Sequence, residues 1–167
     1  AGTGKYIWHF QVSHHDLWDY DLPTPPNLVT VNRDGKKVDA VAQLTKQGWI
    51  FVFDRETGSP LFPIEEKPVP PSEMPDEQSS ATQPFPSLPP PLTSHKFDTG
   101  LVTDISPESH DFIMKAIENH SLGEIYQPQN TRGIVQVPGF RGGGEWSGAA
   151  FDPETGKMYI GANNIPN

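Results

Sequence analysis

The chain contains no cysteine among its 167 residues, so a disulfide framework and a thiolate metal site are both excluded. Basic residues are scarce, with 12 Lys and Arg against 21 Asp and Glu and a formal net charge of -9. Because phosphate binding needs clustered cations, this balance argues against a nucleic-acid partner. Apolar runs are short, and none approaches the roughly 18 residues of a membrane helix. We therefore expect no membrane span in this segment.

Turn-forming residues are abundant instead. The chain has 19 prolines and 15 glycines, and only 34% of it is hydrophobic. Its apolar patterning predicts short strands at 5–12, 27–32, 36–44, 49–53, 133–137, 147–151 and 157–161. The continuous apolar run at 49–53 is typical of a strand covered on both faces. An Asp34-Gly35 turn is expected to join the second and third strands into a hairpin.

One helix is expected between Pro107 and Asn119. Ser106 would be its N-cap and Pro107 its first helical residue, where a missing backbone N–H costs nothing. The apolar side chains of this helix would form a stripe that consists of Phe112, Ile113, Ala116 and Ile117.

The segment 60–92 has a different composition, because eleven of the 19 prolines lie between Pro60 and Pro91. Proline removes backbone donors, which argues against a central strand or a long helix there. We interpret the segment as an extended surface excursion, and composition alone leaves a disordered linker open. Phe85, Leu88 and Leu92 favour a loop that lies against the body of the protein.

A Thr-Gly turn recurs at Thr3-Gly4, Thr57-Gly58 and Thr155-Gly156, next to predicted strands. A repeated strand–turn–strand unit is typical of propeller blades with four short strands each. The alternative is that Asp-x-x-Thr-Gly is simply a common hairpin turn.

Two short runs contain the candidate catalytic residues. His14 to Asp21 has the sequence His-His-Asp-Leu-Trp-Asp-Tyr-Asp, and Lys46 stands just before the apolar strand at 49–53. An acid and a basic group brought together are the usual components of a proton-abstracting site. A blander interpretation remains open, in which Asp16, Asp19 and Asp21 satisfy loop amides and Lys46 is an exposed strand-end lysine.

These runs belong to four blocks whose order and spacing cover nearly the whole chain. The blocks are 8–23, 45–58, 82–91 and 138–153, the last with Gly-Glu-Trp-Ser-Gly-Ala-Ala-Phe-Asp-Pro from Gly144 to Pro153. Together they resemble the quinoprotein dehydrogenases that use pyrroloquinoline quinone (PQQ), in particular the glucose-dehydrogenase-like branch. The segment 93–132 resembles the family least, and nothing is inferred from it.

The resemblance implies an eight-bladed β-propeller that holds PQQ and a divalent ion, usually calcium, near its axis. By length, this chain would supply about two to three blades, as an all-β fragment of one propeller domain over residues 1–167. The Pro-rich excursion at 60–92 and a helical insertion at 106–120 would interrupt it. The Thr3-Gly4-Lys5 to Trp8 pattern resembles the motif that joins neighbouring blades in this family.

The resemblance also assigns roles to residues. Asp19 matches the catalytic aspartate, the general base that removes the substrate hydroxyl proton while hydride passes to the quinone. Lys46 matches the basic residue that hydrogen-bonds the quinone oxygens, although Lys lacks the bidentate geometry of Arg. In some relatives the aspartate also touches the metal, so Asp19 is a candidate ligand. The family's other metal ligands would lie upstream of this segment.

Two further cofactor-binding candidates follow. Trp146 comes after the glycine run 142–144, which would let the backbone approach a ligand closely, although a packing role is the usual one for tryptophan. Asn163 and Asn164 stand near the position of a quinone-contacting asparagine in relatives, with a different local spacing. His14 and His15 are not expected to bind a transition metal, because neighbouring side chains on an extended chain point to opposite sides.

The function expected from the resemblance is oxidation of an alcohol or an aldose sugar by hydride transfer to PQQ. The full-length protein would be periplasmic and would pass electrons to ubiquinone or a c-type cytochrome, whereas this segment alone would be inactive. The alternatives are a non-catalytic propeller scaffold and a small β domain that binds peptide or glycan. Exposed strand edges would also favour self-association.

Overall fold

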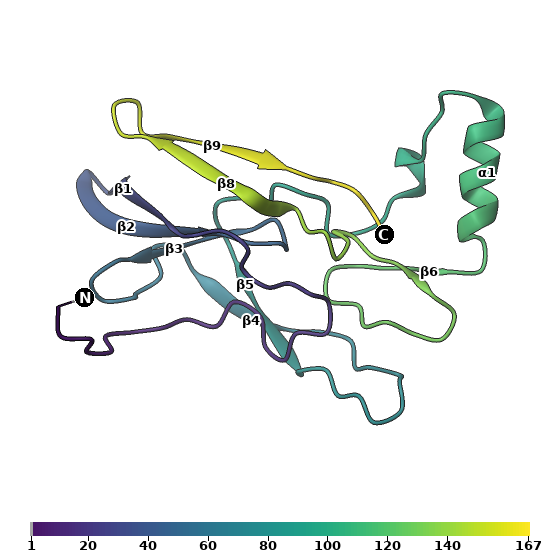
Figure 1. Cartoon of the computed structure of the whole chain (residues 1–167), viewed down its shortest axis with the longest axis horizontal. Coiled ribbons are helices and arrows are strands. Elements are labelled where there is room, and N and C mark those ends of the chain that lie inside the picture. The colour runs from purple at the N-terminus through teal and green to yellow at the C-terminus, as the bar shows by residue number, and fades with distance from the viewer. Residues whose placement is uncertain (1) are drawn as a thin grey trace.

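The structure is a computed structural model that describes residues 2–167 (Figure 1). The elements, in chain order, are β1 (Asn27–Arg33), β2 (Lys36–Leu44), β3 (Ile50–Asp54), β4 (Ile64–Pro68), β5 (Thr82–Pro86), the 3₁₀ helix η1 (Thr99–Leu101), α1 (Pro107–Ile117), β6 (Ser121–Leu122), β7 (Ile134–Val135), β8 (Gly144–Asp152) and β9 (Lys157–Ala162). Strands dominate and one short α-helix is present, which confirms the expected secondary-structure class. No helix in the described part of the chain is long and apolar enough to cross a membrane.

The largest sheet is an antiparallel meander in the order β1-β2-β3. Asp34 and Gly35 connect β1 to β2 with positive φ angles of 51° and 75°, as a type I′ hairpin requires. Arg33 and Lys36 close the hairpin as a cross-strand pair. The predicted hairpin is therefore confirmed, and the turn residues explain its register.

Strand β3 is covered on both faces, as the apolar run predicted. Phe51 and Phe53 point into an aromatic core, whereas Ile50 and Val52 point into a second, aliphatic core on the opposite face. The aromatic core also contains four buried aromatic residues from outside β3, Trp18, Tyr20, Trp49 and Tyr126. Because side chains alternate along a strand, one five-residue segment holds the two cores together.

The β8–β9 hairpin lies over the β1–β2 hairpin (Figure 1) and covers the aliphatic core. Phe151, Met158 and Ile160 of this hairpin pack against residues of β1, β2 and β3. Both strands were predicted at nearly these positions. The sheets within residues 2–167 have three or two strands, so none reaches the four expected for a complete blade.

The strand predicted at 5–12 is wrong, because these residues form no regular strand. The alternating aromatic pattern reflects side-chain packing instead. Trp8 and Phe10 lie against Phe53 with ring centroids 5.7 and 4.9 Å apart. The backbone therefore runs extended over the aromatic core without pairing to the edge of a sheet.

The Thr57-Gly58 and Thr155-Gly156 turns share one hydrogen-bond pattern. Asp54 Oδ1 accepts from the backbone N–H of Thr57, and Asp152 Oδ1 accepts from that of Thr155. In each turn the following glycine has a positive φ, 74° at Gly58. Trp8 joins this system, because its Nε1 donates to the Arg55 carbonyl at 3.1 Å and its ring lies against Gly58. The N-terminal motif thus contacts the next Thr-Gly turn.

The Pro-rich segment contains a strand pair that its composition did not predict. β4 and β5 pair antiparallel, from Ile64 opposite Pro86 to Pro68 opposite Thr82. Phe85 packs on the aromatic core, as its apolar character suggested. Gln83 is fully buried, and its amide bonds the backbone of His14 through both Oε1 and Nε2. These contacts tie the segment to the loop that carries Asp19.

Helix α1 is confirmed with the predicted start. The Ser106 side chain accepts a hydrogen bond from the Ser109 N–H, and Pro107 is the first helical residue. The helix stands at one end of the molecule, away from the main sheet (Figure 1). None of its residues is buried, and Phe112 is 72% exposed.

His95 packs against the β2–β3 turn, and its burial should make the free energy of unfolding depend on pH. Its Nε2 bonds the Gln47 carbonyl at 2.7 Å, and its ring lies edge-on to Trp49, with centroids 4.4 Å apart. Burial lowers the pKa of His95 despite the hydrogen bond to Gln47. The folded state therefore prefers the neutral ring, so this stabilisation is complete above the ordinary pKa of 6.5 and declines as the pH falls below it.

As the pH falls below about 6.5, we expect wild type to lose unfolding free energy more steeply than His95→Gln, which keeps an N–H donor but does not titrate. Urea unfolding of the two chains at several pH values would measure the difference. Parallel curves for the two proteins would contradict the assigned burial of His95.

Candidate functional site

The structure brings Asp19 and Lys46 together, although they are 27 residues apart in the sequence. Lys46 Nζ donates a hydrogen bond to Asp19 Oδ2 at 2.9 Å. Asp19 lies in the loop before β1, and Lys46 lies in the turn between β2 and β3. The acid and the cation that the sequence singled out therefore form an ion pair.

Lys46 occupies a tight hairpin turn. The Gly48 N–H donates to the Thr45 carbonyl at 2.9 Å, and the Thr45 N–H donates to the Trp49 carbonyl at 3.0 Å. Gly48 has a φ of 81°, which glycine adopts without strain. Lys46 is only 7% exposed, so the alternative of an ordinary exposed lysine is wrong. Sequence spacing could not reveal this burial, because the covering residues come from the distant glycine run.

The glycine run approaches protein backbone rather than leaving room for a ligand. The Gly143 N–H donates to the Lys46 carbonyl at 2.6 Å. A Cβ on Gly142 would lie 2.5 Å from Lys46 Cγ, and one on Gly144 would lie 2.5 Å from Leu44 Cγ. The glycines are therefore needed for the close packing of β8 on the Lys46 turn, which corrects the expectation that they admit a ligand.

Asp19 is held by its neighbour Tyr20. The Tyr20 side chain is 1% exposed, and its hydroxyl donates to the Pro138 carbonyl at 2.7 Å. Asp19 itself has a φ of 64°, a left-handed conformation that aspartate tolerates better than most residues. A buried anchor next to a left-handed residue thus directs the exposed carboxylate toward Lys46.

Asp21 is a third charged residue beside Asp19 and Lys46, and the three form one cluster. Lys46 Nζ donates to Asp21 Oδ1 at 2.5 Å, in addition to Asp19. Partial burial disfavours the charged amine, but the hydrogen bonds and negative charges of Asp21 and Asp19 outweigh it and raise the pKa of Lys46. Lys46 is therefore a cation at neutral pH. The sequence interpretation treated Asp21 only as a turn acid, and its spacing of two from Asp19 was the available signal.

An open cavity of about 360 Å³ lies beside the ion pair. Its lining residues are Asp19, Lys46, Phe140, Arg141, Glu145 and Asn163. Sequence reasoning proposed Asp19, Lys46 and Asn163 but missed the other three. Their only signal was their position around the glycine run, which brings them to the Lys46 turn.

The other residues that the sequence singled out have different surroundings. Trp146 is 78% exposed and is not among the residues that line this cavity, so the packing role expected for it is wrong. Trp18 is a packing residue as expected, with 2% exposure and an Nε1 bond to the Gln127 carbonyl. Asn163 faces the cavity, and its backbone N–H donates to the Gly143 carbonyl at 2.8 Å.

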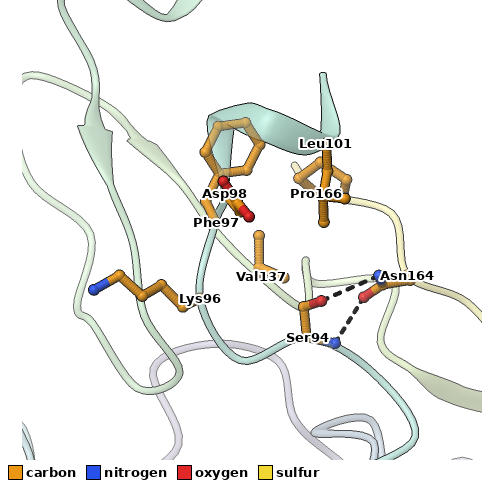
Figure 2. A pocket seen from close by; sticks show the side chains of 8 residues that line it. All are labelled: Ser94, Lys96, Phe97, Asp98, Leu101, Val137, Asn164 and Pro166. Atoms are coloured by element: carbon orange, nitrogen blue, oxygen red, sulfur yellow. Dashed lines mark hydrogen bonds between the residues drawn. The ribbon is translucent and has the colours of Figure 1, made fainter. Parts of the chain in front are cut away.

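Asn164 points to a different hollow, of about 260 Å³ (Figure 2). Its Oδ1 accepts from the Ser94 N–H at 2.8 Å, and its Nδ2 bonds Ser94 Oγ at 3.2 Å. Phe97, Val137 and Pro166 line the apolar part of this hollow. Asn164 therefore fixes the chain after β9 and does not reach the Asp19–Lys46 pair's cavity.

The described residues 2–167 contain no group of three or more His, Asp or Glu side chains arranged to hold a metal ion. His14 bonds Glu66 Oε1 through Nε2 at 2.9 Å, and its backbone N–H bonds Gln83. His14 thus orients the loop. Asp19 and Glu145 are the carboxylates at the cavity, and together they are too few to complete a cation site.

Comparison with known proteins identifies relatives along the entire chain. The family model described as PQQ glucose/ethanol/alcohol dehydrogenase, β-propeller domain, matches residues 1–167. The quinoprotein glucose dehydrogenase A of Acinetobacter calcoaceticus is 37% identical over 177 residues, which cover 99% of this chain and 21% of that protein. The glycerol dehydrogenase large subunit of Gluconobacter thailandicus is 34% identical, over 98% of this chain and 23% of that protein.

Solved structures show the same fold. A quinohemoprotein alcohol dehydrogenase from Comamonas testosteroni superposes with a TM-score of 0.54 at 26% identity, over 98% of this chain and 18% of that one. A europium-containing methanol dehydrogenase gives a TM-score of 0.55 at 22% identity, over 94% of this chain and 21% of that one. The chain is thus an open part of a β-propeller, and it spans about a fifth of the length of these relatives.

Proposed function

Because the chain belongs to the β-propeller family of PQQ-dependent glucose, ethanol and alcohol dehydrogenases, we propose that it supplies the Asp19–Lys46 part of such an enzyme's active site. The full-length protein that contains this segment would oxidise an alcohol or an aldose sugar. The observation that carries the proposal is the ion pair between Lys46 Nζ and Asp19 Oδ2 at the wall of a polar cavity.

The residues at the cavity suit an anionic, oxygen-rich cofactor. Lys46 and Arg141 provide N–H donors and positive charge, and Phe140 provides an aromatic edge. Asn163 adds an amide to the same wall. PQQ carries carboxylates and quinone oxygens, and when bound it supplies a two-electron acceptor for hydride. We propose that Lys46 and Asn163 contact PQQ. Trp146 does not line this cavity, so it would contact PQQ only if the cofactor extended beyond the cavity.

Asp19 is the proposed general base. Its carboxylate is 66% exposed beside the cavity, and it gives only one of its oxygens to Lys46. The other oxygen is therefore free to accept the proton of a substrate hydroxyl. Lys46 keeps a positive charge close to the reacting groups, where it favours negative charge that develops on an acceptor oxygen.

A divalent ion such as calcium would need ligands beyond this segment. Asp19 supplies a carboxylate of the kind that calcium prefers, but the described residues offer no complete ligand set. We propose that the missing ligands come from other blades, and that the isolated 167 residues are inactive for this reason. In the full-length protein we also propose a periplasmic location, with ubiquinone or a c-type cytochrome as electron acceptor.

A propeller scaffold without catalysis is the competing function. A scaffold has no need for a lysine side chain that is only 9% exposed and is held by two acids beside a polar cavity, since such a group is costly to bury. The geometry therefore favours the dehydrogenase.

Reconstitution of the full-length protein tests the proposal. We expect the cofactor-free protein to gain dye-linked dehydrogenase activity toward alcohols or aldoses only when PQQ and calcium are both added. Fluorescence titration would measure quinone binding separately from turnover. Binding of quinone with no oxidised substrate would point to a substrate outside the panel, whereas no quinone binding would favour the scaffold.

A further inference from the structure

Asp21 contacts Lys46 from outside the candidate cavity. Its Oδ1 accepts a hydrogen bond from Lys46 Nζ, which also donates to Asp19 Oδ2. Of the three residues in this cluster, Asp19 and Lys46 line the cavity and Asp21 does not. Asp21 is therefore placed to act on Lys46 and not on a molecule in the cavity.

The position of Asp21 is set by the buried residue before it. Tyr20 donates its hydroxyl to the Pro138 carbonyl and accepts a hydrogen bond from Gln136 Nε2 at 3.2 Å. A tyrosine hydroxyl is protonated at neutral pH, so it keeps its donor role. With Tyr20 fixed in the core, the carboxylates on either side of it are presented to the same ammonium group.

Two of the N–H groups of the Lys46 ammonium have acceptors in the structure. An ammonium group has three N–H donors, of which one goes to Asp19 and one to Asp21. One donor is left for the cavity. A lysine side chain has four flexible carbons, so a single carboxylate fixes its end poorly, whereas two carboxylates restrict both its position and the direction of the remaining N–H.

We propose that Asp21 is a positioning residue: it holds the Lys46 ammonium at the cavity wall and shares its charge, so that Asp19 is not the sole counter-ion. Without Asp21, the ammonium would either turn entirely to Asp19, which would occupy the base, or leave the wall. The positioning of Lys46 follows from the contacts, and its benefit to a bound quinone rests on the function proposed above.

The test compares wild type with Asp21→Asn, Asp21→Glu and a matched control, Asp39→Asn, in the full-length protein. Asp39 has nearly the same exposure as Asp21, 55% against 54%, and also holds one cation, Arg55, at 2.6 Å. The first readout is the rate of reductive methylation of Lys46 in cofactor-free protein, followed by mass spectrometry. The second is the dissociation constant for PQQ, with circular dichroism and melting temperature to confirm folding.

We expect Asp21→Asn to speed Lys46 methylation and to weaken PQQ binding, each by about tenfold, because asparagine can still accept a hydrogen bond from Lys46 but removes the negative charge that strengthens it. Asp21→Glu should keep the methylation rate and the PQQ affinity close to those of wild type. Asp39→Asn should change neither the methylation rate nor the PQQ affinity. An unchanged methylation rate in a folded Asp21→Asn protein would overturn the proposal, as would faster methylation with unaltered PQQ affinity. Faster methylation in a protein whose wild type binds no quinone would preserve the positioning role and reject the proposed function instead.

Discussion

Asp19→Asn is expected to lower kcat of the full-length, PQQ-loaded protein by about 100- to 10,000-fold, the range for loss of a general base. Asparagine has the size of aspartate and can still accept the hydrogen bond from Lys46 Nζ, which the structure places 2.9 Å from Asp19 Oδ2. It cannot accept a proton from the substrate hydroxyl. The loss should therefore appear in turnover, and quinone affinity should change much less.

Asp16→Asn is the control for this variant. Asp16 lies in the same loop, and its Oδ1 accepts the Trp18 N–H at 2.9 Å, a contact that asparagine preserves. Steady-state assays with the substrate that wild type oxidises best would measure both variants. Full turnover by Asp19→Asn, or an equal loss in Asp16→Asn, would show that Asp19 is not the base.

Phe51→Ala should destabilise the chain by about 3–5 kcal/mol, the usual cost of removing a fully buried phenylalanine side chain. Phe51 is 0% exposed and stacks on Phe53 with centroids 6.3 Å apart. It also lies edge-on to Trp49, which follows the turn that holds Lys46. The cavity left by the substitution would open beside that turn, so the candidate site should loosen together with the core.

Phe112→Ala provides the matched control, because this phenylalanine on α1 is 72% exposed. A surface substitution of this kind should change stability by no more than about 0.5 kcal/mol. Urea unfolding of both variants would give the comparison. Similar losses for the two variants would mean that the aromatic core is not where the structure places it.

Local features were the most predictable. The Asp34-Gly35 hairpin, the Ser106 cap of α1 and the run that became β3 each depend on residues adjacent in sequence. The strand predicted at 5–12 failed because alternation of aromatic residues indicates which side chains are buried, and does not show whether the backbone pairs. The pairing of β4 with β5 was missed because proline content conceals strands at the edge of a sheet.

By itself, the sequence determined the strand-rich class, the turns and, through its resemblance to a family, the pairing of Asp19 with Lys46 as candidates. Only the tertiary structure decided that Lys46 is buried, that Asp21 shares it, and that Arg141 and Glu145 reach the same cavity. The physical reason is distance along the chain: local patterns govern backbone conformation, whereas burial and charge pairing depend on segments that meet only when the aromatic and aliphatic cores close around β3.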